Sequence, residues 1–221
     1  MRIPMISLAA VAVAMLAGTQ ASAAPPPPGT FETFNTGVDD SHNVLAQGDI
    51  ETHYTVSDLW YGGTVTQYVE TSSQGWPIAP NGPWLGDDTS SRWIGPGDQS
   101  SPFYYDYQTT FTLTDYEAAR AFITGRWSTD DYGFDILING QSTGQSAANF
   151  VDWYDFSITS GFVTGTNTLD FIVYNTGGPG GLRVEMSGGV PEPASWALML
   201  GGFGLVGGVM RSRRKAAVSF A

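Results

Sequence analysis

The chain has 221 residues and no cysteine, which excludes disulfide bonds and thiolate zinc sites. Without such cross-links a domain depends on its hydrophobic core, and a central region of about 160 residues is large enough to form one. Histidine is scarce too, because only His42 and His53 could supply imidazole as a ligand or base. Both lie in a polar stretch near the start of the domain, where two ordinary polar histidines are a simpler interpretation than a metal pair.

Basic residues are also scarce in the centre of the chain. Between Pro25 and Gly188 there is no lysine, and four arginines stand against 20 aspartates and glutamates, which gives a net charge of −16. Such a surface repels phosphate backbones and anionic membrane surfaces, so nucleic acid is excluded as a partner. Neutral sugars, cations and basic molecules remain compatible with it.

The first 23 residues, MRIPMISLAAVAVAMLAGTQASA, have the order of a secretory signal peptide. Arg2 supplies a positive charge, an apolar run follows, and Ala21 and Ala23 provide the small side chains that signal peptidase requires at its cleavage site. A first transmembrane helix is the weaker alternative, because the run is short. Residues 24–30, APPPPGT, are predicted to form a spacer whose four prolines favour polyproline II.

The centre of the chain, residues 31–188, is predicted to fold as one all-β domain, a β-sandwich or jelly roll. Short alternating runs of apolar and polar residues are separated by turn residues, and no sustained helical period is present. In GLRVEMSG, for example, alternation places Leu182 and Val184 inward and Arg183 outward. The predicted strands lie within residues 51–60, 63–70, 108–114, 119–128, 133–144, 167–175 and 181–188.

The sequence also predicts the positions of turns and loops. The dipeptide Asn139–Gly140 predicts a hairpin turn, because both residues tolerate positive φ. Residues 74–103 hold five prolines, five glycines and three tryptophans, and they predict a long loop rather than strands. Only DYEAARA, residues 115–121, could form a helical turn.

The second half of the domain has a recognisable order. GRWSTDDYGFDILINGQSTG is followed by an aromatic stretch with Phe150 and Phe156, and then by GTNTLDFIVYNTGGPGGLRVE. This order resembles the galactose-binding-like jelly-roll domains found in many exported bacterial proteins. The resemblance covers about Tyr105 to Ser187, and it implies the same β-sandwich that the alternation predicts.

The C-terminal segment, residues 190–215, combines three features in a fixed order. Pro191, Glu192 and Pro193 come first, a 17-residue run without charge follows at 194–210, and the segment ends in a basic cluster of Arg211, Arg213, Arg214 and Lys215. As a helix the run would measure about 25 Å, at about 1.5 Å per residue. We therefore expect a single C-terminal transmembrane helix with a stop-transfer cluster.

This order resembles the PEP-CTERM protein-sorting signal. The resemblance implies recognition by an exosortase in the inner membrane of a Gram-negative cell, where the segment holds the exported precursor until it is removed. Delivery to the cell surface or the extracellular matrix would follow, and such proteins are associated with exopolysaccharide and biofilm. A permanent anchor is the alternative interpretation of the segment.

Paired acids are the first candidates for chemistry in the domain. Calcium prefers clustered oxygen ligands, which makes Asp87, Asp130 and Asp131 its candidates, although turn acids on a solvated surface are the simpler interpretation. Two carboxylates could also hydrolyse glycosides, but neighbours on a strand point to opposite faces. The sequence contains no nucleophile elbow, P-loop or dinucleotide fingerprint, and we expect no enzymatic activity.

Aromatic residues are the better indication of function. Flat aromatic faces stack on sugar rings while Asp, Asn and Gln bind hydroxyls, a mixture typical of small-ligand sites. Trp93 and Trp127 are expected in the core. The candidate ligand contacts in or beside loops are Trp76, Trp84, Trp153 and Tyr154.

These observations favour an exported, non-catalytic surface or matrix protein that binds carbohydrate. One alternative is a structural matrix protein whose acidic surface is bridged by divalent cations. A glycosidase or lyase is a third possibility, with the weakest support.

Overall fold

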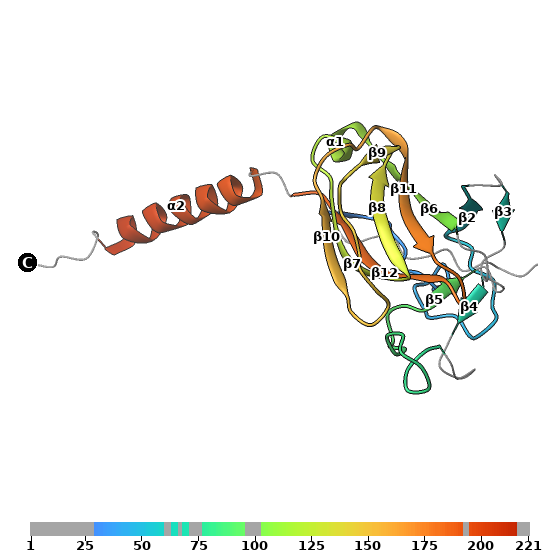
Figure 1. Ribbon diagram of the computed structural model, residues 1–221. Coiled ribbons are helices and arrows are strands. Elements are labelled where there is room, and N and C mark those ends of the chain that lie inside the picture. Colours follow the sequence, from blue (N-terminus) through green and yellow to red (C-terminus); the bar gives the residue numbers. More distant parts are fainter. Residues whose placement is uncertain are drawn as a thin grey trace, which may run out of the picture.

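The computed structural model describes residues 29–59, 63–65, 68–70, 77–95, 103–191 and 195–215. Within them two antiparallel β-sheets pack face to face, and a C-terminal helix lies apart from the sandwich (Figure 1). The predicted all-β sandwich is therefore confirmed.

The first sheet has the strand order β10-β7-β12-β5-β4, and β1 pairs with the end of β12. In that order the strands are Tyr154–Ile158, Phe122–Asp130, Gly181–Gly189, Trp93–Gly95 and Tyr68–Glu70, with β1 at Thr30–Phe31. The second sheet has the order β3-β2-β6-β11-β8-β9. Its strands are Thr64–Val65, Thr55–Asp58, Phe103–Leu113, Gly165–Asn175, Tyr132–Ile138 and Gln141–Ser142.

The core lies between the sheets and is centred on Trp127 of β7. Its ring centroid lies 5.6 Å from that of Phe171 on β11, and the ring of Phe156 on β10 lies 5.8 Å from the same Phe171. From Asn167 to Asn175 every second residue of β11, including Leu169 and Val173, is buried here. The faces predicted from alternation are confirmed for these strands, because a sheet with one face on the core buries residues at a period of two.

Two local predictions are confirmed as well. Asn139 and Gly140 have φ values of 50° and 76° and connect β8 to β9 as a two-residue turn. The segment DYEAARA begins with the short helix α1, Asp115–Ala118. Thr114 caps this helix and forms a capping box with Glu117.

The long loop predicted at residues 74–103 is interrupted by β5, which the sequence did not indicate. The residues before it, 77–92, lie against the outer face of the first sheet, and we call them the cover loop. Ile78, Trp84 and Trp93 form a second, small hydrophobic cluster beneath it. Trp93 is therefore in a core, as expected, although this core is separate from the one between the sheets.

The cover loop buries Arg183 completely. This side chain points away from the inter-sheet core, as predicted, yet its exposure is 0%. Its guanidinium donates to Ser91 Oγ at 2.8 Å and to the carbonyl oxygen of Gly86 at 2.5 Å, and it pairs with Asp88 Oδ2 at 2.8 Å. A buried charge is tolerated only when it is paired and hydrogen-bonded, and the cover loop supplies all three partners.

A second polar contact ties the cover loop to the sheet. Trp84 Nε1 donates to Asp130 Oδ2 at 2.8 Å, and both residues are buried. Burial and, to a smaller extent, the neighbouring Asp131 together raise the pKa of Asp130 to about 7, while the hydrogen bond from Trp84 opposes this shift.

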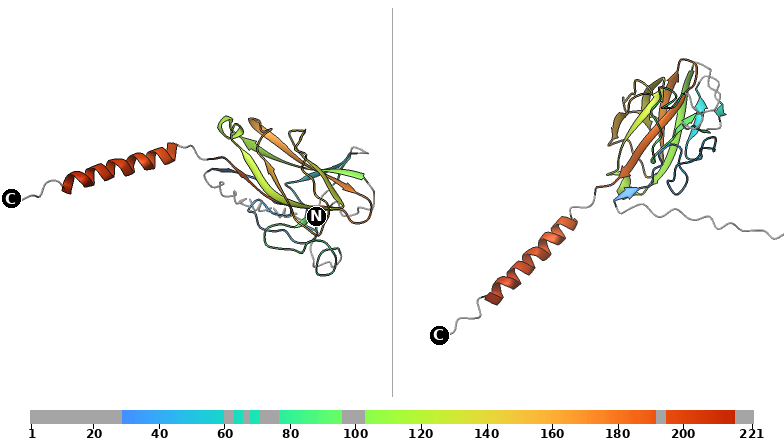
Figure 2. Two further views of the ribbon diagram at one scale, coloured as in Figure 1. Left: turned by 60° about the vertical axis from the view of Figure 1, so that its left-hand side comes forward. Right: turned by 90° about the horizontal axis from the view of Figure 1, so that it is seen from below.

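Helix α2, Ser195–Lys215, extends away from the sandwich in every view (Figure 2). A helix at this position agrees with the expectation for residues 194–210. None of the helices in the described part of the chain combines the length and hydrophobicity needed to cross a bilayer.

The first prediction concerns the packing of Trp127. Gly133 of β8 lies against its indole ring, and a Cβ added there would overlap three ring atoms. We expect Gly133→Ala to lower the free energy of unfolding by about 1–3 kcal/mol, the usual effect of overpacking a core. Denaturant unfolding followed by tryptophan fluorescence measures this change. The matched control is Gly63→Ala, where nothing lies within 4 Å of the added atom, and an equal loss in both variants would contradict the prediction.

The second prediction concerns the pH dependence of stability. Because the folded state raises the pKa of Asp130 above its unfolded value, the folded state binds the proton more tightly, and this residue contributes more stability as the pH falls from about 8 to about 5. Asp130→Asn keeps an acceptor for Trp84 but removes the titration. We therefore expect the stability of this variant relative to the natural chain to be highest at pH about 8 and to decline toward pH about 5. Unfolding curves across this range test it, with the exposed Asp152→Asn as control, and parallel pH profiles for all three proteins would refute it.

Candidate functional site

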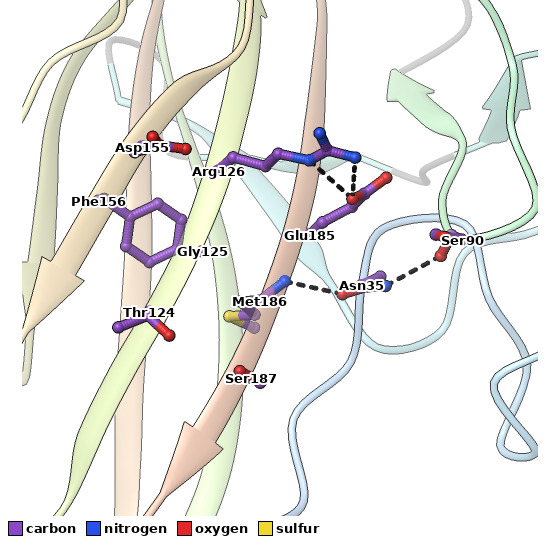
Figure 3. A pocket seen from close by; sticks show the side chains of 10 residues that line it. All are labelled: Asn35, Ser90, Thr124, Gly125, Arg126, Asp155, Phe156, Glu185, Met186 and Ser187. Carbon is purple, nitrogen blue, oxygen red and sulfur yellow. Dashed lines mark hydrogen bonds and ion pairs between the residues drawn. The ribbon is translucent and has the colours of Figure 1, made fainter.

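A polar groove runs along the outer face of the first sheet, over β10, β7 and β12 (Figure 3). Its volume is about 620 Å³. The three strands are adjacent in the sheet but far apart in the sequence, so their outward residues meet only through strand pairing. The groove lies on the face that the cover loop partly covers.

A charged row crosses the floor of the groove. Asp155 pairs in register with Arg126, and Arg126 pairs with Glu185. The Arg126 guanidinium binds Glu185 Oε2 through Nε at 2.8 Å and through Nη2 at 2.6 Å (Figure 3). The next row contains only hydroxyl side chains, from Ser157, Thr124 and Ser187.

The cover loop fixes the charged row from one side. Glu185 Oε1 accepts from Ser91 Oγ at 2.9 Å, and Ser91 in turn accepts from the buried Arg183. Burial lowers the pKa of Arg183, while the carboxylates of Asp88 and Glu185 raise it, so the guanidinium keeps its charge. The network therefore joins two arginines to two carboxylates and is balanced in charge.

Trp153 lies where the groove meets this network. Its ring centroid is 4.4 Å from the guanidinium carbon of Arg126 and 5.0 Å from that of Arg183. The side chain is half-buried, and Trp153 precedes Asp155 by two residues, which places both on one side of the chain. Cation–π contacts of this kind orient the indole without enclosing it.

Asn35 forms a side wall of the groove. Its Oδ1 accepts from the amide of Met186 at 2.8 Å, and its Nδ2 donates to the carbonyl oxygen of Ser90 at 2.9 Å (Figure 3). Because both ends of this side chain are bound, Asn35 holds the cover loop and β12 at a fixed separation. The groove thus offers carboxylate acceptors and a guanidinium donor on a preformed surface, with the ring of Trp153 beside it.

The four predicted ligand-contact aromatics have different positions. Trp153 lies beside the groove, whereas Tyr154 packs partly against the main core and accepts from Asn149 through its hydroxyl at 2.8 Å. Trp84 is 2% exposed beneath the cover loop and has no face free to stack on a ligand, which corrects the expectation for this residue. Trp76 lies outside the described residues.

The predicted calcium ligands do not form one cluster. Asp130 is engaged by Trp84, and Asp131 Oδ2 accepts from the amide of Thr176 at 2.7 Å and from its hydroxyl. Asp87 lies in the cover loop, close enough to act electrostatically on Arg183. Across the described ranges, no group of three or more acidic or histidine side chains is arranged to hold a metal ion. His42 and His53 both stack on Phe34, at 4.9 Å and 3.6 Å between ring centroids.

The groove residues Arg126, Asp155 and Glu185 were not among the predicted site residues. Alternation placed Glu185 outward, and the same pattern applies to Arg126 and Asp155. Their meeting in one row depends on the registers of two strand pairs, which no local pattern contains.

The sorting segment begins where the fold ends. Val190 is buried, and its amide donates to the carbonyl oxygen of Gly29 at 2.7 Å. Pro191, the next residue, is exposed. Glu192 and Pro193 lie outside the described residues, as do Ala21 and Ala23 of the predicted signal-peptide site. Arg211 is exposed on α2, and the backbone of α2 includes Arg213, Arg214 and Lys215.

Several solved structures are similar in overall shape. TmCBM61, solved in complex with β-1,4-galactotriose, shares 10% identity at a TM-score of 0.40, over 62% of this chain and 88% of that one. CBM35 from Paenibacillus barcinonensis shares 16% identity at a TM-score of 0.34, over 64% and 98%. A family 35 carbohydrate-binding module from Clostridium thermocellum shares 14% at 0.34, over 63% and 98%. At such scores the fold assignment rests on the two sheets described above.

No curated protein sequence matches the chain. A family model does match its C-terminal segment, over the stretch that contains Pro191, Glu192, Pro193, α2 and the basic cluster. This agrees with the resemblance noted from the sequence and marks an exported protein. Residues 189–215 are a PEP-CTERM protein-sorting motif.

Proposed function

We propose that the chain is an exported, non-catalytic protein that binds carbohydrate in the groove of the first sheet. The observation that carries the proposal is the row Asp155–Arg126–Glu185 beside the half-buried ring of Trp153. Carboxylates and a guanidinium bind pairs of neighbouring hydroxyls, and an aromatic ring stacks on the apolar face of a sugar. A site of this kind fixes a ligand by a few polar groups on a preformed surface.

The charge of the site favours a neutral sugar. Arg126 and Arg183 are offset by Glu185 and Asp88, and Asp155 adds one further negative charge, so the site has no excess positive charge to attract an acidic sugar. The surrounding domain carries −16, which disfavours acidic polysaccharides at longer range.

The same contacts argue for binding rather than catalysis. Glu185 already accepts from Arg126 and Ser91, and Asp155 is exposed to solvent on β10. Both oxygens of Glu185 are engaged, so this carboxylate is not free to protonate a leaving group or to attack a sugar ring. The groove thus suits recognition of a sugar more than cleavage of one.

In this proposal the two terminal segments determine where the protein is delivered. Signal peptidase cleaves after Ala23, and an exosortase recognises Pro191-Glu192-Pro193 at the inner membrane of a Gram-negative cell and removes the tail. The mature domain then works at the cell surface or in an exopolysaccharide matrix such as that of a biofilm. Support comes from the sorting motif and from the position of Pro191, exposed directly after the last buried residue of the domain.

The third prediction tests sugar binding. We screen the full chain on a glycan array and titrate the best neutral oligosaccharide against two variants. Trp153→Ala should weaken binding about tenfold, because a stacked aromatic contributes about 1–1.5 kcal/mol and about 1.4 kcal/mol is tenfold. Asp155→Ala should weaken binding severalfold without affecting the fold, since Asp155 is exposed.

The matched control for that titration is Tyr116→Ala. Arg120 lies 4.4 Å from the ring centroid of Tyr116 in α1, so this pair has the geometry of Trp153 and Arg126 but lies away from the groove. Equal loss in control and groove variants, or no binding to any sugar, would rule the proposal out. In the second case a structural role in the matrix remains.

The fourth prediction concerns processing in the native host. The mass of the mature protein should correspond to a chain that starts at Ala24 and ends near residue 190. Replacement of Glu192 by Ala should leave the tail in place, because the sorting enzyme reads the Pro-Glu-Pro step. The Met210→Ala variant keeps that step and should be processed normally. A mature mass that includes the tail in the natural chain would establish a permanent anchor instead.

A further inference from the structure

The outer face of the second sheet carries a row of tyrosines. Tyr104 of β6 pairs in register with Tyr174 of β11, which pairs with Tyr132 of β8. Their partners on the opposite face, such as Tyr105 and Val173, are buried in the core, so this row faces solvent. Tyr104 and Tyr132 are 40% and 52% exposed.

A bulge adds a fourth ring to this row. The register of β8 shifts so that Phe134 has no partner of its own on β11. Bulges of this kind redirect a side chain, and here Phe134 is 62% exposed and meets Tyr104 at 5.4 Å and 80° between ring planes. Tyr104 also lies 4.6 Å from Tyr174 at 40°. The rings thus enclose a corner instead of forming a flat stack.

Two carboxylates lie beside this aromatic corner. Asp106 follows Tyr104 on the same face of β6, and its register partner is Ile172. Asp170 lies in the next row, is 5% exposed, and accepts from Gln108 Nε2 at 2.7 Å. Asp106 Oδ1, in contrast, is buried and has no hydrogen-bond partner.

No cation offsets these carboxylates within the part of the chain that the structure describes. The ion pairs found there involve Asp40, Asp88 and Glu185, and none involves Asp106 or Asp170. Burial and, to a smaller extent, the charge of Asp170 together raise the pKa of Asp106 to about 6. At pH about 7.5 Asp106 is nevertheless mostly ionised, so an unpaired, partly buried negative charge lies next to the aromatic corner.

We propose that this face is a second ligand site, which binds a glycan carrying free ammonium groups, such as a deacetylated amino-sugar chain. The ammonium group lies in the corner of Tyr104 and Phe134 and pairs with Asp106. The sugar ring that carries it stacks on the neighbouring tyrosines. An ammonium group is attracted both to aromatic faces and to an adjacent carboxylate, and desolvation strengthens both attractions.

An amino sugar fits this face better than a basic peptide does. Its ammonium group is fixed to a rigid ring whose apolar side can lie on the tyrosine row at the same time. A lysine carries its ammonium on four rotatable bonds and loses much of its side-chain entropy when held. The row Tyr104–Tyr174–Tyr132 crosses three strands, which is about 10 Å at the usual strand spacing and is long enough for more than one sugar ring.

This site differs from the groove in charge and in position. The groove lies on the first sheet and pairs its carboxylates with arginines, whereas Asp106 and Asp170 lie on the second sheet without such partners. Binding at one site therefore does not depend on binding at the other. A free glucosamine polymer should bind here, and a neutral sugar should bind in the groove.

The test is a calorimetric titration of the full chain with a β-1,4-linked glucosamine hexamer and with its fully N-acetylated counterpart. We expect the acetylated hexamer to bind at least about tenfold more weakly, because it has no ammonium group. Asp106→Asn and Phe134→Ser should each weaken binding of the glucosamine hexamer about tenfold. The groove variant Asp155→Asn should bind it as the natural chain does.

Each other outcome overturns the proposal. Equal binding of the two hexamers excludes ammonium recognition, and no binding of the glucosamine hexamer excludes the site. If an oligolysine of the same charge binds as tightly and is equally sensitive to Asp106→Asn, the ligand is a basic peptide. If Asp155→Asn weakens binding of the glucosamine hexamer as much as Asp106→Asn does, the amino sugar binds in the groove. Thermal unfolding of each variant establishes that a loss of binding is not a loss of the fold.

Discussion

The buried guanidinium of Arg183 is the constraint on which the first sheet and its groove depend. A charge with 0% exposure is stable only with partners, and all of its hydrogen-bond and ion-pair partners except Glu185 lie on the cover loop. The loop must therefore lie where Gly86, Asp88 and Ser91 can reach this side chain. Ser91 then positions Glu185, which positions Arg126 and, through it, Trp153. The geometry of the groove therefore follows from the need to pair the buried charge of Arg183.

The shortage of basic residues gives the two outer faces different properties. Of the four arginines in the domain, Arg92, Arg126 and Arg183 are all used on the first sheet or its cover loop. The outer face of the second sheet holds Asp106 and Asp170 and receives none of them. The first face thus pairs some of its acids with arginines, whereas Asp106 and Asp170 on the second face have no arginine partner among the described residues. A domain with more lysine could not keep its faces so distinct, because long basic side chains would neutralise the exposed acids.

The sequence predicted most of the longer strands, but not β5 or β10, and it did not predict which side chains come together across strands. Alternation identified the inward residues of β11 and β12, and the Asn139–Gly140 turn was correctly located. Alternation predicts the face of the sheet on which a side chain lies, but it does not predict whether another segment covers that face. For this reason the sequence did not predict the burial of Arg183 and of Trp84. The groove and the tyrosine row both require registers across three strands. Those registers are set by the packing of the whole sandwich rather than by local residues.

Strand order also links the fold to the sorting motif. The last strand, β12, pairs with β7, β5 and β1, and it supplies both Arg183 and Glu185. The first sheet and its groove are therefore incomplete until the chain has been exported as far as Val190, whose amide closes on Gly29. The sorting motif overlaps the end of that strand at residue 189. A chain that ends before Gly189 therefore lacks both the last residue of β12 and the sorting motif.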